Sequence, residues 1–106
     1  MYSVWIITTD LTENQNKNLI KNLSEDDQKI MSELDLKISV DLIDDEDHIT
    51  SVMVCNQIDI EKIKDFLTRN NVKWDVEDGT NLFENIEELT EENIIEKMCK
   101  DVESDK

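Results

Sequence analysis

The segment from Leu36 to Cys55 constrains the fold more than any other part of the chain. It holds two strand-length apolar runs joined by a short tip made only of acidic residues. From Leu36 to Leu42, apolar and polar residues alternate, which is the period-two pattern of a strand with one buried face. From His48 to Cys55 both faces carry apolar groups, which indicates an interior strand. We therefore predict a β-hairpin whose charged tip faces solvent.

Two further segments have the composition of strands. Tyr2 to Thr9 is β-branched and aromatic on both faces, so we expect a second interior strand there. Val72 to Glu77 alternates between apolar and polar residues and should be a one-faced strand at an edge of the sheet.

Three helices are predicted between these strands from apolar residues at helical spacing. Thr12 and Gln15 form a candidate capping box for the first helix. Asp59 can cap the third, and Asn70-Asn71 supplies its end. The predicted ranges are Asp10 to Leu23, Ser24 to Leu34, and Asp59 to Asn70.

The resulting order of elements is a split βαββαβ pattern. We predict an α+β fold: a ferredoxin-like, four-stranded antiparallel sheet with helices on one face and an added C-terminal helical segment. A length of 106 residues suits one compact domain. We expect a single domain over residues 1–106, with a βαββαβ core over 1–80 and an acidic helical tail over 81–106. Such a common fold implies no function by itself.

The tail is helical by propensity, but its apolar residues do not keep to one face. Thr90 is a candidate second N-cap, so we expect two helices or a sharp bend there. Both interior strands have two apolar faces. One face should therefore be left open by the crossover helices and should carry Trp5, Ile7, Ile49 and Met53. The tail can cover this face through Leu82, Phe83, Ile86 and Leu89; a partner chain or a second copy is the alternative.

The balance of charge limits the partners of the chain. It has 27 acidic and 11 basic residues, a formal net charge of -16. Such a surface repels nucleic acid, anionic membranes and acidic substrates. We expect a basic protein as partner, with no direct binding to nucleic acid or membrane. We see neither a signal peptide nor a membrane span, so we predict a cytoplasmic protein, in the host cell if it is encoded by a phage.

No motif in the sequence predicts a reaction. His48 lies at the solvent end of its strand and Cys55 at the other end, which is over about 20 Å for seven residues, so they cannot form a catalytic dyad. The acidic tip lacks the glycine of a hard-cation loop, and the loop around Gly79 has Trp74 and Val76 where ligands should be. Cys55 and Cys99 lie in apolar patterns typical of buried thiols. We therefore expect no enzyme activity, no metal site and no cofactor.

The negative charge is concentrated in two segments. Asp41 to Asp47 contains five acids and no base, and Asp75 to Lys106 contains twelve acids and three lysines. On helices, carboxylates one turn apart would form rows about 5 to 6 Å in spacing, close to that of phosphates along a nucleic-acid strand. The predicted partner-binding carboxylates are Asp44, Asp45, Glu46, Asp47, Glu84, Glu87, Glu88, Glu91, Glu92 and Glu96.

In composition the chain resembles the small acidic proteins of phages and mobile elements that block CRISPR effectors or restriction enzymes, or otherwise mimic DNA. This resemblance implies an inhibitor that occupies the basic groove of a nucleic-acid-binding protein or nuclease complex. Two alternatives stay open. The charge can simply keep a small domain soluble, or the chain can be a regulatory or assembly module that forms a homodimer, or binds a ligand, through its apolar sheet face.

Overall fold

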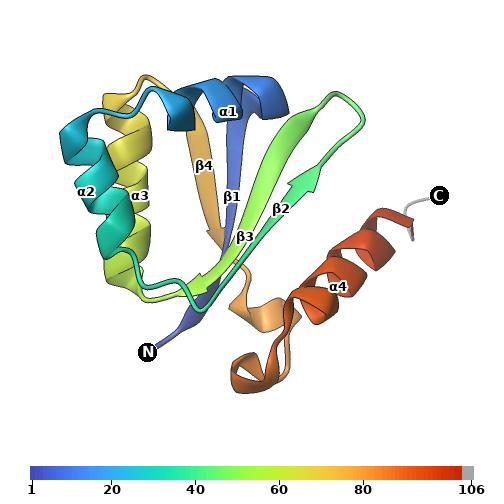
Figure 1. The fold of residues 1–106 in the computed structure, drawn as a ribbon. Coiled ribbons are helices and arrows are strands. Elements are labelled where there is room, and N and C mark those ends of the chain that lie inside the picture. The colour runs from blue at the N-terminus through green and yellow to red at the C-terminus, as the bar shows by residue number, and fades with distance from the viewer. Residues whose placement is uncertain (104–106) are drawn as a thin grey trace.

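The protein is an α+β molecule built on one four-stranded antiparallel sheet (Figure 1). The computed structural model describes residues 1–103, and the side chains of residues 1–98. The predictions for the side chain of Cys99 and for residues 104–106 lie outside this part. The strands are β1 (Ser3–Thr12), β2 (Ile38–Ile43), β3 (His48–Cys55) and β4 (Trp74–Asp78). The helices are α1 (Glu13–Lys21), α2 (Glu25–Glu33), α3 (Gln57–Arg69) and α4 (Glu91–Glu103), with short 3-10 helices η1 (Thr80–Leu82) and η2 (Ile86–Glu88).

The order of strands across the sheet is β2-β3-β1-β4. The predicted hairpin is confirmed, since β2 pairs with β3 in antiparallel register from Ile38 opposite Val54 to Ile43 opposite Ile49. The strands predicted to be apolar on both faces, β1 and β3, are the interior strands, and the one-faced strands β2 and β4 are the edges.

Several element boundaries differ from the predicted ones, and three of the differences have a visible cause or consequence. The first strand continues to Thr12, which then caps α1 with Gln15 in the predicted capping box. The third helix begins after Asn56 rather than at Asp59. Asp59 lies inside its first turn, where it is buried and accepts a hydrogen bond from the backbone N–H of Asp35 (3.4 Å). The last strand begins at Trp74, since Val72 instead closes the end of α3 by donating to the carbonyl of Leu67 (2.9 Å).

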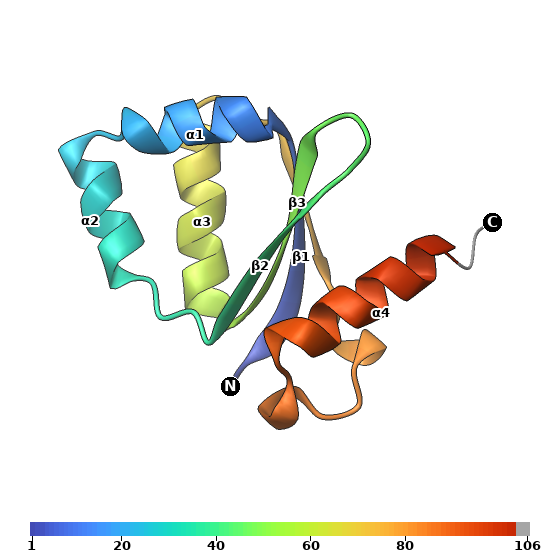
Figure 2. The same cartoon turned by 45° about the vertical axis from the view of Figure 1, so that its right-hand side comes forward.

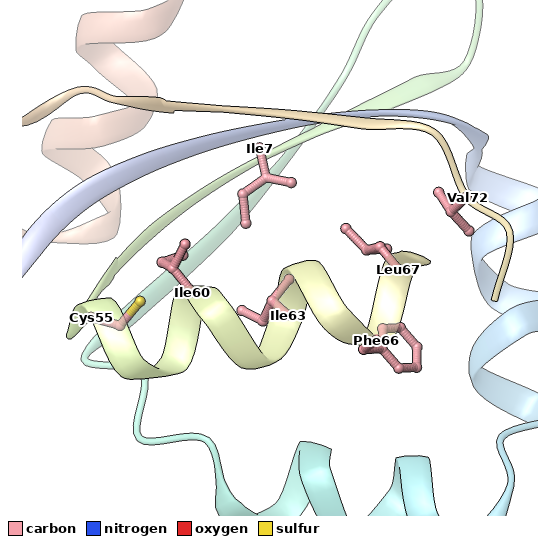
Figure 3. Close-up of a cluster of buried hydrophobic side chains, with 7 residues drawn as sticks. All are labelled: Ile7, Cys55, Ile60, Ile63, Phe66, Leu67 and Val72. Carbon is pink, nitrogen blue, oxygen red and sulfur yellow. The ribbon is translucent and has the colours of Figure 1, made fainter. Parts of the chain in front are cut away.

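Helices α1, α2 and α3 lie on one side of the sheet, and α3 packs directly against it (Figures 1 and 2). The buried side chains between α3 and the sheet, the helix-side core, converge from strands, helix and the following loop (Figure 3). They are Ile7, Cys55, Ile60, Ile63, Phe66, Leu67 and Val72.

The opposite side of the sheet is covered by the tail, residues 80–103 (Figure 2). A second core, the tail-side core, joins strand residues to Ile94 of α4, with Phe83, Ile86, Leu89 and Met98 packed around it. Its buried residues are Val4, Ile38, Val40, Val52, Val54 and Ile94. The expectation that the tail covers one sheet face is therefore confirmed, although Leu82 stays 41 % exposed.

The predicted identity of the open face is wrong. Trp5, Ile7 and Met53 lie on the helix side, where Ile7 is buried and the other two pack around the helix-side core. Ile49 is also buried, and alternation along β3 places it on the same side as Met53. Both faces of β1 and β3 are apolar, so alternation alone could not tell which face the crossover helices cover.

The tail is less helical than predicted. A break at Thr90 is confirmed, because its hydroxyl accepts the N–H of Asn93 (3.2 Å) at the start of α4. The preceding segment, however, forms two 3-10 turns instead of an α-helix. Asn85 separates them in an extended conformation, and its side-chain oxygen accepts the N–H of Glu87 (3.1 Å).

Candidate acidic interaction surface

All ten carboxylates predicted to contact a partner are exposed. They fall into two groups, which we call the tip and the tail carboxylates. The tip carboxylates lie between β2 and β3, and the tail carboxylates lie on η2, on α4 and in the segment between η1 and η2. The tip group is Asp44, Asp45, Glu46 and Asp47; the tail group is Glu84, Glu87, Glu88, Glu91, Glu92 and Glu96.

The tip is shaped by its own hydrogen bonds. One Asp44 carboxylate oxygen accepts the backbone N–H groups of Glu46 and His48, both at 2.9 Å. Asp47 takes a left-handed conformation, φ 68°, and its carbonyl accepts the N–H of Glu13 (2.8 Å). His48 Nδ1 lies 3.8 Å from Glu46 Oε2 and 4.0 Å from Asp44 Oδ1. The Asp44 carboxylate therefore stabilises the turn. The carboxylates of Asp45, Glu46 and Asp47 accept neither of these two backbone hydrogen bonds.

Three of the tail carboxylates, Glu84, Glu88 and Glu96, line a shallow groove of about 450 Å³ between α4 and the segment that precedes it. Glu84 and Glu88 come from that segment and Glu96 comes from α4, so residues distant in sequence meet at one place. Lys97 adds one positive charge to the same groove. Its remaining lining is apolar or neutral: Leu82, Phe83, Asn85, Leu89 and Asn93.

Ion pairing differs between the two sides of the sheet. On the helix side, Lys17, Lys62, Lys64 and Arg69 each lie within 4 Å of a carboxylate. Within the part of the chain that the structure describes, five tail carboxylates have no Lys or Arg at this distance: Glu84, Glu87, Glu88, Glu91 and Glu92. The cations of the helix layer are therefore largely compensated, and most of the tail charge is not.

The start of the tail is anchored to β1. The N–H of Gly79 donates to the carbonyl of Val4 (2.8 Å), and the N–H of Val4 donates to the Thr80 hydroxyl (3.1 Å). Hydrogen bonds from Thr80 also lower the pKa of the Asp78 carboxyl. A Cβ atom at Gly79 would lie only 2.8 Å from Ile6 Cδ1, so this close approach favours glycine.

The tip and tail groups are not one continuous row. The tail reaches the beginning of β2, where Lys37 Nζ donates to the carbonyl of Glu87 (3.2 Å), whereas the tip follows the end of β2. Six residues at about 3.3 Å each place the Glu87 end of the tail on the order of 20 Å from the tip. The predicted helical row over Glu84, Glu87 and Glu88 is wrong, because these residues lie in and before a 3-10 turn; Glu92 and Glu96 do lie one turn apart on α4.

Sequence analysis missed two carboxylates of the tail side. Asp75 and Glu77 pair with Thr8 and Ile6 across β1 and β4, on the face opposite Val76. Since Ile6 packs around the tail-side core, Asp75 and Glu77 point to the side that the tail covers. The alternation of apolar and acidic residues in Trp74–Asp78 can be read from the sequence. Only the register of β4 against β1 shows which side of the sheet Asp75 and Glu77 lie on.

The two side chains considered for a catalytic dyad, Cys55 and His48, lie at opposite ends of β3. Burial raises the pKa of the Cys55 thiol to about 12, with a contribution from the Asp59 carboxylate, so the thiol is protonated at neutral pH. Among the described residues, no group of three or more His, Cys, Asp or Glu side chains is placed to hold a metal ion. No described helix is both long enough and apolar enough to cross a membrane.

Comparison with protein-family models, with curated proteins and with solved structures finds no match.

Proposed function

We propose that this protein is a non-enzymatic inhibitor that mimics nucleic acid and occupies the basic groove of a nucleic-acid-binding protein or nuclease complex. Proteins of this kind let phages and mobile elements block CRISPR effectors or restriction enzymes. The observation that carries the proposal is a set of exposed tail carboxylates that have no Lys or Arg within 4 Å in the described part of the chain: Glu84, Glu87, Glu88, Glu91 and Glu92. They are held on a segment that packs against the sheet.

The proposed binding has the same physical basis as the binding of DNA to such a groove. Lys and Arg side chains in a nucleic-acid groove bind anionic oxygens and release the counterions held around them. Carboxylates placed on a packed scaffold lose less side-chain and backbone freedom on binding than those on a disordered acidic segment. Glu84 and Glu88 line the tail groove and have no Lys or Arg within 4 Å in the described structure, so they meet this requirement. The acids of the helix layer that form ion pairs are already engaged.

We also propose that the scaffold is ferredoxin-like. The strand order β2-β3-β1-β4, the antiparallel pairing of all neighbours, and the placement of α1 and α3 on one side of the sheet support this assignment. The extra helix α2 and the tail are additions to that arrangement. The assignment bears on the shape of the scaffold and not on its target.

A displacement assay tests the function. Purified CRISPR effector complexes and restriction endonucleases are loaded with a fluorescent DNA duplex, and the protein is added at 50 and 300 mM NaCl. We expect release of the duplex from at least one of them, with an affinity that falls steeply as salt rises. The triple variant Glu84→Lys, Glu88→Lys, Glu92→Lys should release none.

A matched control variant distinguishes an effect of the tail surface from an effect of the net charge of the whole protein. The variant Asp10→Lys, Asp26→Lys, Asp35→Lys changes the total charge equally at exposed residues outside the tip and tail groups. It should keep most of the activity. If it loses as much as the tail variant, or if no panel member releases DNA, the charge serves only solubility and the inhibitor proposal is wrong.

The alternative, a regulatory or assembly module, gains no support. It depended on an open sheet face formed by Trp5, Ile7, Ile49 and Met53. Ile7 and Ile49 are buried, and Trp5 and Met53 pack around the helix-side core, so these side chains do not form an exposed patch.

A further inference from the structure

The sheet has an edge at which a further strand can pair. In the part of the chain that the structure describes, β4 pairs with β1 and has no strand on its other side (Figure 1). The other edge strand, β2, has α4 packed alongside it. An unpaired strand edge presents a row of backbone N–H and C=O groups that another extended chain can bind.

Two backbone hydrogen bonds show how β4 is oriented against β1. The N–H of Gly79 donates to the carbonyl of Val4 (2.8 Å), and the carbonyl of Lys73 accepts the N–H of Asp10 (3.2 Å). Gly79 follows β4 and Lys73 precedes it, and both continue the register of this strand pair. In an antiparallel pair, every second residue turns both its N–H and its C=O to the partner strand. The odd-numbered residues of β4 therefore turn these groups to β1.

The even-numbered residues of β4 turn their backbone groups to the open edge. They are Trp74, Val76 and Asp78. The strand is also held in place from the helix side, because Trp74 Nε1 donates to Thr68 Oγ1 of α3 (2.9 Å) and Lys64 Nζ lies 5.7 Å from the centre of the Trp74 ring. A docking strand would thus meet donors and acceptors that are already extended, which lowers the entropy cost of binding.

The side chains of β4 define the chemistry of a strand that could pair there. Trp74 and Val76 lie on the helix side, where Val76 packs around the helix-side core. Asp75 and Glu77 are exposed on the other side of the sheet. Residues opposite each other on neighbouring strands interact directly, and opposite charges there are favourable. A strand with lysine or arginine facing Asp75 and Glu77, and with apolar residues in between, is the complement of this edge.

A second copy of the chain does not fit this edge. If two β4 strands paired antiparallel about Val76, Asp75 of one copy would lie directly opposite Glu77 of the other, and the two-fold symmetry would repeat this contact. Like charges directly opposite each other destabilise a sheet. The acids that oppose self-association at the edge therefore favour a cationic strand.

We propose that the open edge of β4 is a docking site for an extended basic segment of a partner protein, which adds a strand to the sheet. The backbone groups of Trp74, Val76 and Asp78 supply the pairing, and the carboxylates of Asp75 and Glu77 supply the preference for lysine or arginine at alternate positions. This inference is independent of the proposed inhibitory function, because that function depends on the tip and tail carboxylates.

Amide exchange measured by NMR on the full chain tests the pairing. The probe is a synthetic peptide of about seven residues in which lysine and valine alternate. In the free protein, the amides of Asp75 and Glu77 should be protected and those of Val76 and Asp78 should not. Saturating peptide should slow exchange at Val76 and Asp78 at least about fivefold. Binding that leaves these two amides unprotected, or no binding at all, would overturn the proposal.

The variant Val76→Pro tests the contribution of the backbone. Proline removes an N–H that points to the open edge and none that bonds to β1, which is a position where an edge strand tolerates proline. The change should weaken peptide binding at least about tenfold. Val76→Thr keeps the N–H and the branched shape and should bind as the wild type does. Protection of the Glu77 amide reports that β4 still pairs with β1. Equal affinities of the two variants would contradict backbone pairing.

A charge reversal tests the preference for cations without the proline variant. Asp75→Lys with Glu77→Lys should bind the lysine peptide at least about tenfold more weakly and should bind a peptide of alternating glutamate and valine instead. Asp26→Lys with Asp35→Lys changes the net charge equally at exposed residues away from β4 and should keep the wild-type preference. If both double variants change the preference alike, net charge explains the binding and the docking site on β4 is wrong.

Discussion

Asp27 joins two helices through a buried charge. Its side chain is 7 % exposed, its Oδ1 lies 2.8 Å from Arg69 Nη2, and its Oδ2 accepts a hydrogen bond from Asn70 (3.1 Å). Oδ1 has no hydrogen bond in the described structure, so the Arg69 charge is its principal compensation. A buried carboxylate without its counter-charge is costly, and this ties the position of α2 to the end of α3.

The Asp27 contact predicts a large effect of Arg69→Met, which keeps much of the stem and removes the charge. We expect a loss of about 2 kcal/mol in the free energy of unfolding, below the ~3–5 kcal/mol of fully buried pairs because Arg69 is 39 % exposed. Urea denaturation measures it. Lys17→Met breaks an exposed pair and should cost less than about 0.5 kcal/mol. Equal losses would contradict the role given to Asp27.

Cys55 predicts a loss of stability at alkaline pH. Burial raises the pKa of its thiol to about 12, above the ~8.5 of an exposed thiol, so the unfolded chain releases this proton first as pH rises. Its contribution to stability is intact below about pH 8 and is lost from there up to about pH 12. The stability difference between the wild type and Cys55→Ala should shrink by about 1–2 kcal/mol between pH 7.5 and 10 in urea titrations. A constant difference would contradict this.

At the scale of elements, the tail shows how capping competes with helix propensity. The segment before Thr90 has helix-forming residues, but Asn85 holds its side-chain oxygen against the N–H of Glu87 and interrupts a continuous helix. After Thr90, the hydroxyl cap starts α4, and Ile94 points into the tail-side core. Stability of the tail therefore comes from the contact that α4 makes and not from its length alone.

Two neighbouring residues of α4 test whether this contact holds the tail. Ile94 is fully buried and Ile95 is 42 % exposed. Ile94→Ala should lower the free energy of unfolding by about 2–4 kcal/mol, and Ile95→Ala should change it by less than about 0.5 kcal/mol. Both changes occur in the same helix, so helix propensity cancels in the comparison by urea denaturation. Similar losses would mean that α4 is not docked as described.

At the scale of the whole molecule, charge is segregated across the sheet. Four cations of the helix layer, Lys17, Lys62, Lys64 and Arg69, pair with acids. The far side carries the tail carboxylates together with Asp75 and Glu77. The molecule measures 40 × 34 × 19 Å, and α4 lies on the other side of the sheet from α3 (Figure 2). The tip follows the end of β2, whereas the segment around Glu87 lies near its beginning, and α4 runs alongside β2 (Figure 1).

This separation predicts two contributions to binding. Asp45→Lys with Glu46→Lys changes the tip and spares Asp44, which shapes the turn; Glu84→Lys with Glu88→Lys changes the tail. Each pair should weaken binding to the target found in the displacement assay and reduce its salt slope by about 2. The losses should add, because the Glu87 end of the tail lies on the order of 20 Å from the tip. A tip variant with unchanged affinity would place the tip outside the interface.

Much of the fold could be predicted because it depends on patterns among residues that are close in the sequence. Period-two alternation located the hairpin, and the capping box at Thr12 and Gln15 was correct. The end of α3 at Asn70 and Asn71 was also correct, since Asn71 takes the left-handed conformation, φ 61°, that asparagine tolerates. The site was predictable only as a set of exposed acids. The meeting of Glu84, Glu88 and Glu96 at one groove depends on how the tail turns back along α4, which no spacing in the sequence encodes.

The sequence by itself determined which strands are interior, where the chain turns, and that its surface must be strongly acidic, because alternation, capping and ionisation depend on neighbouring residues or on composition. Only the tertiary structure decided which face of β1 and β3 meets α3 and which meets the tail. Both faces are apolar and equally suited to burial, so the choice depended on the register of β2 against β3, which places Ile38 and Val40 beside Val54 and Val52 under the tail. That choice also determines where the uncompensated carboxylates of the tail lie.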